Sequence, residues 1–221
     1  MNYKDGTFEL SDVPFYSQVK RIKDDKTMQE TGTRINKYMS QCGYCSRREA
    51  DRLIEKGEVW INGTLATMGT KVMPGDTVMV HHTTITPCQK EYLLAFHKPA
   101  GIVCTTSKID KNNVIDYLNF PERIYPVGRP DKESTGLLLL TNNGQLMDDI
   151  LRGSNYHEKE YIVHVNKPIT DSVLQAMAQG VPILDTITRP CKIRRMGKDC
   201  FYITLTQGLN RQIRRMCEYF D

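Results

Sequence analysis

The stretch Gly128-Arg129-Pro130-Asp131-Lys132-Glu133-Ser134-Thr135-Gly136 runs directly into the apolar segment Leu137-Leu138-Leu139-Leu140. Glycine and proline bound the first part, which predicts a turn that carries the carboxylate of Asp131 between two cations, Arg129 and Lys132. The apolar run has the length of a buried strand, and such a strand would hold the turn rigid. A single aspartate in a turn is usually a solvated loop residue, so the meaning of Asp131 depends on the rest of the chain.

Composition places the chain of 221 residues among ordinary globular proteins of one or two domains. No apolar run approaches the roughly 20 residues of a membrane span, and the N-terminus lacks the pattern of a secretion signal. The seven cysteines are an odd number and lie in predicted helices and strands, which favours reduced thiols and a cytoplasmic location. The net charge of +4 permits a nucleic-acid partner without requiring one.

The five histidines have no metal-ligand spacing with Asp or Glu. The segment Cys42-Gly43-Tyr44-Cys45 has the spacing of a metal or redox motif, but the sequence offers no second ligand pair and no thioredoxin-like context. We therefore interpret Cys42 and Cys45 as structural thiols and the histidines as structural or surface groups.

The first 32 residues are polar and mixed in charge, which is typical of a poorly ordered extension. From Thr33 the pattern becomes compact, with a short helix predicted over 34–41. Ser46 and Glu49 form a capping box that opens a second helix to about residue 56, and Asn62-Gly63 predicts a hairpin turn.

The second helix carries a basic face, because Arg48, Arg52 and Lys56 are spaced four residues apart. Basic helix faces are usually only solvated, and Arg47 or Arg48 could form surface ion pairs with Asp51. We expect no acidic partner for Arg52 or Lys56 along their own stripe, which favours phosphate contacts.

Residues 33–80 resemble the S4-type RNA-binding module, a small α/β platform that docks on RNA. The resemblance rests on Arg34-Ile35-Asn36-Lys37-Tyr38, Cys45-Ser46-Arg47-Arg48-Glu49-Ala50-Asp51 and Val59-Trp60-Ile61-Asn62-Gly63. It implies RNA contacts at Arg34, Lys37, Arg47, Arg48 and Arg52.

We expect a linker over 81–91 and a larger catalytic domain over 92–221. Strands are predicted over 92–96, 124–127, 136–141, 161–165, 191–195 and 201–205, and helices over 146–152 and 171–179. Because strands and helices do not alternate strictly, the pattern predicts an α+β fold with a mixed, largely antiparallel sheet.

Four segments, in chain order, resemble the pseudouridine synthases, and in particular the family acting on ribosomal RNA of the small and large subunits whose members carry an N-terminal S4 module. They are His97-Lys98-Pro99-Ala100-Gly101-Ile102-Val103, the Asp131 turn with Thr141-Asn142-Asn143-Gly144, His157-Glu158-Lys159-Glu160-Tyr161, and Gly208-Leu209-Asn210-Arg211-Gln212-Ile213-Arg214-Arg215-Met216. The match is collinear from about residue 33 to 220. The amino-acid sequences of residues 180–184 and 207–217 are most similar to those of the F-type branch, which acts on large-subunit rRNA.

This resemblance implies an enzyme that isomerises a uridine in RNA to pseudouridine: the base leaves the ribose at N1, turns over and rejoins through C5. No atom is gained or lost and no redox step occurs, so neither a cofactor nor a metal is implied. A carboxylate is required, and Asp131 matches the catalytic aspartate of the family. Whether it attacks C1′ of the ribose, adds to C6 of the base or removes the C2′ proton stays open.

The same resemblance assigns roles to two further residues. Arg214 matches the arginine that pairs with the aspartate, and an opposite charge favours the ionised carboxylate. Tyr161 matches the tyrosine that stacks on the flipped target base. The structural alternatives are that Tyr161 is a tyrosine in the core of a strand and that Arg214 is a surface cation of an amphipathic helix.

Three more cations are expected to contact RNA: Arg129, Lys98 and Arg211. Arg129 precedes the catalytic aspartate and would keep the flipped conformation open or contact a phosphate.

The sequence departs from the family in two places. Pro130 stands where relatives usually have leucine, which a tight turn tolerates. The chain stops at Asp221, whereas relatives continue for some tens of residues, so we expect a C-terminally short catalytic domain with reduced stability and turnover. The competing function is an RNA-binding ribosome-assembly protein with a weak or inactive synthase domain.

The implied partner is a stem-loop of 23S rRNA, with a tRNA anticodon loop as the alternative target. We expect a monomer that does not interact with membranes.

Overall fold

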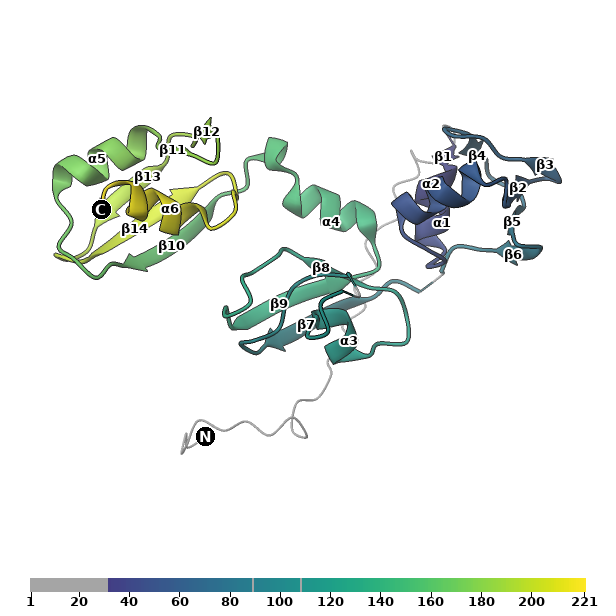
Figure 1. Ribbon diagram of the computed structural model, residues 1–221, viewed down its shortest axis with the longest axis horizontal. Helices are drawn as coiled ribbons and strands as arrows, with labels where there is room; N and C mark the ends of the chain where they lie inside the picture. The colour runs from purple at the N-terminus through teal and green to yellow at the C-terminus, as the bar shows by residue number, and fades with distance from the viewer. Residues whose placement is uncertain (1–31, 89, 108) are drawn as a thin grey trace, which may run out of the picture. The chain divides into compact units, whose positions relative to one another are not determined.

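The computed structural model describes residues 32–88, 90–107 and 109–221, which lie in two compact units, 1–147 and 148–221 (Figure 1). Apart from Gly32, the extension predicted for 1–32 lies outside the described residues. No helix in the described ranges is long and apolar enough to cross a membrane.

The first unit begins with the S4-like segment. Its elements are β1 (Thr33–Arg34), α1 (Ile35–Gln41), α2 (Arg47–Glu55), β2 (Val59–Ile61), β3 (Thr64–Leu65), β4 (Lys71–Val72), β5 (Val78–Val80) and β6 (Thr83–Ile85). Four of the strands form an antiparallel sheet in the order β3-β2-β5-β6, and β1 pairs with β4. Ile85 is buried at the edge of this sheet, so part of the segment predicted as a linker is instead a strand.

Local sequence signals explain these elements. The Ser46 hydroxyl accepts a hydrogen bond from the backbone N–H of Glu49 at 3.1 Å, which confirms the predicted N-cap of α2. The β2–β3 turn has left-handed residues at Asn62 (φ 50°) and Gly63 (φ 79°), as a two-residue hairpin requires. The apolar face of α2 then packs into a core with the sheet through Ala50, Leu53 and Ile54.

The same unit continues with β7 (Leu93–Lys98), α3 (Val114–Leu118), β8 (Tyr125–Val127) and β9 (Gly136–Thr141). β9 lies between β7 and β8 and is antiparallel to both. Leu94, Leu138 and Leu140 are buried in its core. Helix α3 was not predicted from the sequence; it begins where the Asn113 side chain accepts hydrogen bonds from the N–H groups of Ile115 and Asp116.

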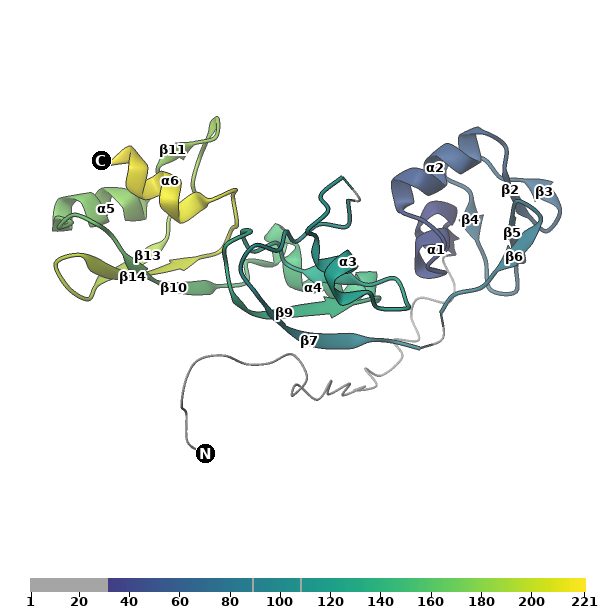
Figure 2. The same ribbon diagram turned by 60° about the horizontal axis from the view of Figure 1, so that its bottom comes forward.

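The boundary between the units falls within α4 (Gly144–Leu151), which is followed by a 3-10 turn at Gly153–Asn155. The second unit contains β10 (Lys159–His164), α5 (Asp171–Gln179), β11 (Pro182–Ile183), β12 (Thr186–Ile187), β13 (Lys192–Arg195), β14 (Cys200–Leu205) and α6 (Gln212–Tyr219). Its sheet has the antiparallel order β10-β14-β13, and α5 and α6 pack on one face (Figures 1 and 2).

The predicted α+β class is therefore confirmed. Every described strand pairs in antiparallel fashion, and the parallel element among the described residues is an isolated bridge between Val103 and Asn113.

Candidate active site and RNA-binding surface

The Asp131 turn precedes β9, the central strand of its sheet, as the sequence predicts. Gly128 (φ 107°) and Gly136 (φ 113°) bound it in conformations that favour glycine. The carbonyl of Asp131 accepts a hydrogen bond from the N–H of Ser134 at 3.0 Å. The Asp131 side chain is half-buried in this closed turn.

Lys98 supports the Asp131 turn from inside the protein. It is 1% exposed, and its ammonium donates to the carbonyls of Pro99 (2.9 Å), Lys132 (2.9 Å) and Ser134 (2.7 Å). The N–H of Gly101 also donates to the carbonyl of Lys132 at 2.9 Å. Because an ammonium has three donors, Lys98 has none left for a phosphate, so its predicted RNA contact is wrong.

Arg129 lies on the exposed side of the same turn. Its positive charge acts on the thiol of the neighbouring Cys104. Burial raises the pKa of this thiol, and the positive charges of Lys98 and Arg129 partly offset the increase. Two cations therefore surround the base of the loop that carries Asp131, one buried and one facing solvent.

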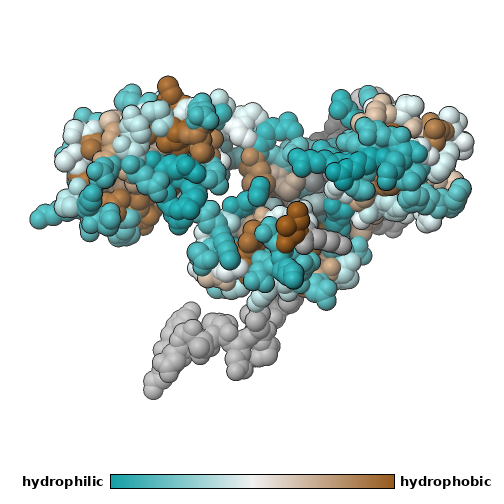
Figure 3. Space-filling view, viewed as in Figure 1, coloured by the Kyte–Doolittle hydropathy of each residue, from teal (hydrophilic) through white to brown (hydrophobic). Residues whose placement is uncertain are grey.

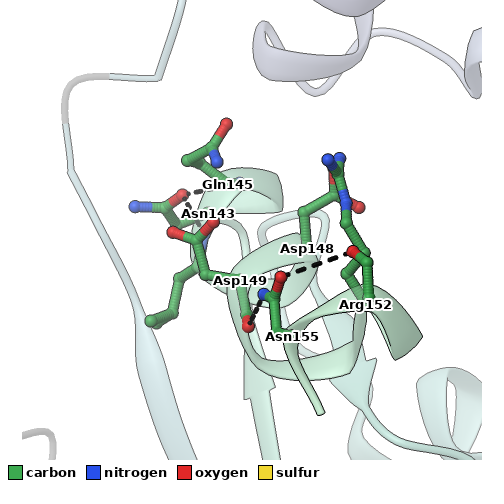
Figure 4. A network of polar contacts seen from close by, with 8 residues as sticks. Asn143, Gln145, Asp148, Asp149, Arg152 and Asn155 are labelled. Atoms are coloured by element: carbon green, nitrogen blue, oxygen red, sulfur yellow. Dashed lines mark hydrogen bonds and ion pairs between the residues drawn. The ribbon is translucent and has the colours of Figure 1, made fainter.

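The motif Thr141-Asn142-Asn143 has a structural role. The Thr141 hydroxyl donates to the carbonyl of Tyr92 at 2.7 Å, and the Asn142 side chain accepts from the N–H of Tyr92 at 2.9 Å. Asn143 caps α4 by accepting from the N–H groups of Gln145 and Leu146 (Figure 4). Figure 4 also shows Asp148, on the last turns of this helix, and Arg152, directly after its end; the two side chains form an ion pair at 2.7 Å. The motif thus joins the start of β7 to the end of β9 and begins α4.

Tyr161 lies on β10 of the second unit, directly opposite Ile203 of β14. Directly opposed residues share a face of the sheet, and Ile203 is buried in the core beneath α5 and α6. Tyr161 itself is 40% exposed, which leaves much of its ring available for stacking. Partial burial raises the pKa of its phenol, so the hydroxyl stays neutral at physiological pH.

Helix α6 has the predicted amphipathic arrangement. Its apolar residues pack into the core, whereas Arg211 and Arg214 are exposed. Gln212 is buried and accepts from the N–H of Leu209 at 3.0 Å, which fixes the turn that starts the helix. Arg215 donates to the backbone and side-chain oxygens of Asn210 at 3.1 and 3.3 Å. The apolar contacts of α6 come from Ile213, Met216, Cys217 and Phe220.

Arg189 has a structural role that was not predicted from the sequence. Its guanidinium lies 4.4 Å from the centroid of the Tyr156 ring and donates to the carbonyls of Gly153 (3.1 Å) and Thr206 (3.3 Å). It thereby ties the segment before β10 to the loop before α6. No local pattern marks it, because its partners are up to 36 residues away in sequence. In the same loop, the side-chain nitrogen of Gln207 is buried without a partner among the described residues.

The S4-like segment carries exposed cations over α2, where hydrophilic side chains gather in Figure 3. Arg34, Arg47 and Arg48 are exposed, and Lys37 is half-buried. Arg52 is also exposed, but it pairs at 3.1 Å with Glu49, a residue outside the 48, 52 and 56 stripe that the sequence analysis considered, so its guanidinium is less available for a phosphate.

The carboxylate of Asp51 accepts a hydrogen bond from the Asn36 side chain at 2.8 Å. Among the cations over α2, Arg47 and Arg48 are therefore the strongest candidates for phosphate contact.

The two thiols of the Cys42–Cys45 motif fit a structural role. Burial raises the pKa of Cys42 to about 11 and also raises that of Cys45. Both thiols therefore stay protonated at neutral pH, which makes them poor nucleophiles.

The fold joins an S4-like segment to a domain in which a half-buried aspartate lies beside a central strand. The chain belongs to the RNA pseudouridylate synthase family, which is a family of RNA-modifying enzymes. The profile of that family matches residues 92–219, and the profile of the S4 domain matches residues 33–78.

Among its relatives, the dual-specificity RNA pseudouridine synthase RluF of Salmonella typhi is 53% identical over 193 residues, which cover 86% of this chain and 67% of that protein. The RluF protein of Escherichia coli strain K12 is 52% identical with the same coverage.

More distant relatives show the same family. The ribosomal large subunit pseudouridine synthase B of Bacillus subtilis is 32% identical over 195 residues, covering 84% of this chain and 79% of that protein. A crystal structure of a pseudouridylate synthase superposes with a TM-score of 0.55 at 25% identity, covering 84% of this chain and 82% of that one.

Proposed function

We propose that this RNA pseudouridine synthase converts a specific uridine in a stem-loop of 23S rRNA to pseudouridine. Residues 33–80 dock on RNA and residues 92–221 carry the chemistry, in a monomer that acts in the cytoplasm. The observation that carries the proposal is the Asp131 turn, which Lys98 and the N–H of Gly101 hold in place through the carbonyls of residues 132 and 134. The relatives named for the large ribosomal subunit and for dual specificity support the substrate.

In this proposal Asp131 supplies the carboxylate that reacts with the target nucleoside. Arg214 is the cation that favours the ionised form of that carboxylate. Tyr161 stacks on the uracil ring after the nucleotide has left its stem-loop, because a base inside a stack cannot turn over. Arg129 and Arg211 contact the phosphates that flank it.

The ring of Tyr161, not its hydroxyl, carries the proposed stacking. Tyr161→Phe should therefore keep the reaction rate within about threefold, whereas Tyr161→Leu should lower it roughly 5- to 150-fold, which corresponds to a loss of about 1–3 kcal/mol of stacking energy. Single-turnover rates on a 23S rRNA stem-loop measure both effects. Ile162→Leu, at an exposed neighbouring position, is the control. Equal rates for the Leu and Phe variants would exclude stacking by Tyr161.

Arg47 and Arg48 are proposed to neutralise phosphates. Replacing both with alanine should weaken RNA binding and reduce the slope of log K against log salt by about 0.7–0.9 per lost contact. Arg52→Ala should have a smaller effect, because its guanidinium already pairs with Glu49. Titrations of labelled RNA at four salt concentrations test this, with Lys167→Ala on the second unit as the control. An unchanged salt slope in the double variant would remove α2 from the RNA-binding surface.

A second target is favoured by one observation, the dual specificity in the name of relatives that are 52–53% identical. We propose a tRNA anticodon loop as this second substrate, since it also presents uridines in a single-stranded loop.

The experiment that tests the function is carbodiimide-based mapping of pseudouridine across total RNA from cells with and without the gene. We expect one 23S rRNA signal to disappear with the gene and to return with the wild-type sequence. A tRNA signal that behaves in the same way would establish the second target. If no RNA loses a pseudouridine, the proposed function is wrong.

A further inference from the structure

The β13–β14 hairpin and the end of the neighbouring strand β10 bring two sulfur atoms and an imidazole nitrogen together. The sulfur of Cys200 lies 3.7 Å from Nε2 of His164 and 3.8 Å from the sulfur of Met196. Cys200 is 7% exposed, whereas Met196 is 49% exposed and His164 also faces solvent. In this cluster the thiol of Cys200 is buried, and the side chains of Met196 and His164 are exposed to solvent.

The backbone holds these three residues in place. His164 and Cys200 are directly opposite each other on β10 and β14, in a ladder of six residue pairs. At the hairpin, the N–H groups of Met196 and Gly197 both donate to the carbonyl of Cys200 at 2.9 Å. The N–H of Val165 donates to the carbonyl of Asp199 at 2.9 Å, which fixes the other side of the turn. The donors are thus carried by rigid elements, as a binding site requires.

The two donor separations that involve Cys200 are compatible with ligands that share one metal ion. In proteins a d¹⁰ ion lies about 2.3 Å from sulfur and about 2.0–2.1 Å from imidazole nitrogen. Two such ligands are then about 3.5–4.0 Å apart at angles between tetrahedral and trigonal. Both separations at Cys200 fall within this range.

We propose that Cys200, Met196 and His164 form a binding site for a soft monovalent cation of the Cu(I) class. Thiolate and thioether ligands select Cu(I), and imidazole suits it as well. On binding, the S–H bond of Cys200 breaks, the proton leaves to solvent and a sulfur–metal bond forms, with no change of oxidation state. The thiolate balances the single positive charge, so the site is neutral when filled.

The thioether distinguishes this site from a zinc site. No group of three or more His, Cys, Asp or Glu side chains in the described ranges is arranged to hold a metal. Besides Cys200 and His164, the site therefore needs the thioether sulfur of Met196 as its third ligand. Zn²⁺ and Mg²⁺ do not favour a thioether ligand. We accordingly expect Cu(I) to bind and Zn²⁺ to bind much more weakly.

The test uses the full chain with ¹³C-methyl-labelled methionine and Cu(I) supplied against a competing chelator. We expect one equivalent of Cu(I) to shift the Met196 methyl signal, which Met196→Leu assigns by its loss. Met196→Leu and His164→Asn should each lower the affinity at this site at least about tenfold. Met68→Leu, an equally exposed methionine in the S4-like segment, should change nothing.

The competing outcome is that Cu(I) binds to other cysteines of the chain. If Cu(I) is taken up while the Met196 signal stays in place, the metal binds thiols elsewhere and the proposal is wrong. Unchanged affinity in both Met196→Leu and His164→Asn would overturn it equally. Cys200→Ser should abolish the shift, and because Cys200 is buried, circular dichroism must first show that this variant folds. If Cys200→Ser does not fold, the Cu(I) affinities of Met196→Leu and His164→Asn test the proposal.

Discussion

Replacing Asp131 with asparagine is expected to lower the rate of pseudouridine formation by more than about 10³-fold and to leave RNA affinity within about threefold. Asparagine keeps the size of the side chain and the backbone turn closed by Ser134. It removes the negative charge, and with it the carboxylate that every proposed route requires as a nucleophile or a base. Single-turnover assays at saturating enzyme separate the chemical step from binding.

The matched control for this substitution is Glu133→Gln, which makes the same change of charge at an exposed position two residues away. It should retain the wild-type rate within about threefold. Comparable losses in both variants would show that the net charge of the loop matters and not the carboxylate of Asp131. An active Asp131→Asn variant would assign the chemistry to another residue.

Replacing Lys98 with methionine is expected to have the largest effect on stability. Methionine fills a similar volume but removes the donor to the carbonyls of residues 99, 132 and 134, of which the carbonyl of residue 132 keeps its bond from the N–H of Gly101. A buried acceptor without a partner costs about 1–3 kcal/mol, so we expect a total loss of roughly 3 kcal/mol after relaxation. The melting temperature should fall by roughly 6–12 °C. The catalytic rate should fall as well, because the Asp131 turn loses its internal support.

Lys132→Met is the control for this substitution, since Lys132 is exposed in the same loop. It should change stability by no more than about 0.5 kcal/mol. If Lys98→Met instead keeps its melting temperature and selectively weakens RNA binding, the original expectation of an RNA contact at Lys98 would be restored.

Features that depend on neighbouring residues could be predicted from the sequence. The N-cap at Ser46, the turn at Asn62-Gly63 and the apolar stripe of α6 each rest on residues within one or two turns of each other. In each case, residues that are close in sequence form the local structure by contacting one another, so their spacing predicts it. The pairing of Arg52 with Glu49 belongs to this class too, because residues three apart face each other on a helix.

Features that depend on distant residues could not be predicted. The partners of Lys98 lie up to 36 residues along the chain, and nothing in the His97-Lys98-Pro99 segment distinguishes a buried ammonium from an exposed one. The contacts of Arg189 with Gly153 and Thr206 have the same character. The roles of Asp131, Tyr161 and Arg214 came from the motif resemblance, since spacing alone does not reveal which carboxylate reacts.

The most direct test of the account is in vitro conversion of 23S rRNA fragments by the purified chain, with pseudouridine located by carbodiimide mapping after exhaustive incubation. We expect the wild type and Glu133→Gln to convert one stem-loop uridine to completion, while Asp131→Asn converts none. Conversion by Asp131→Asn, or no pseudouridine from the wild type, would contradict it.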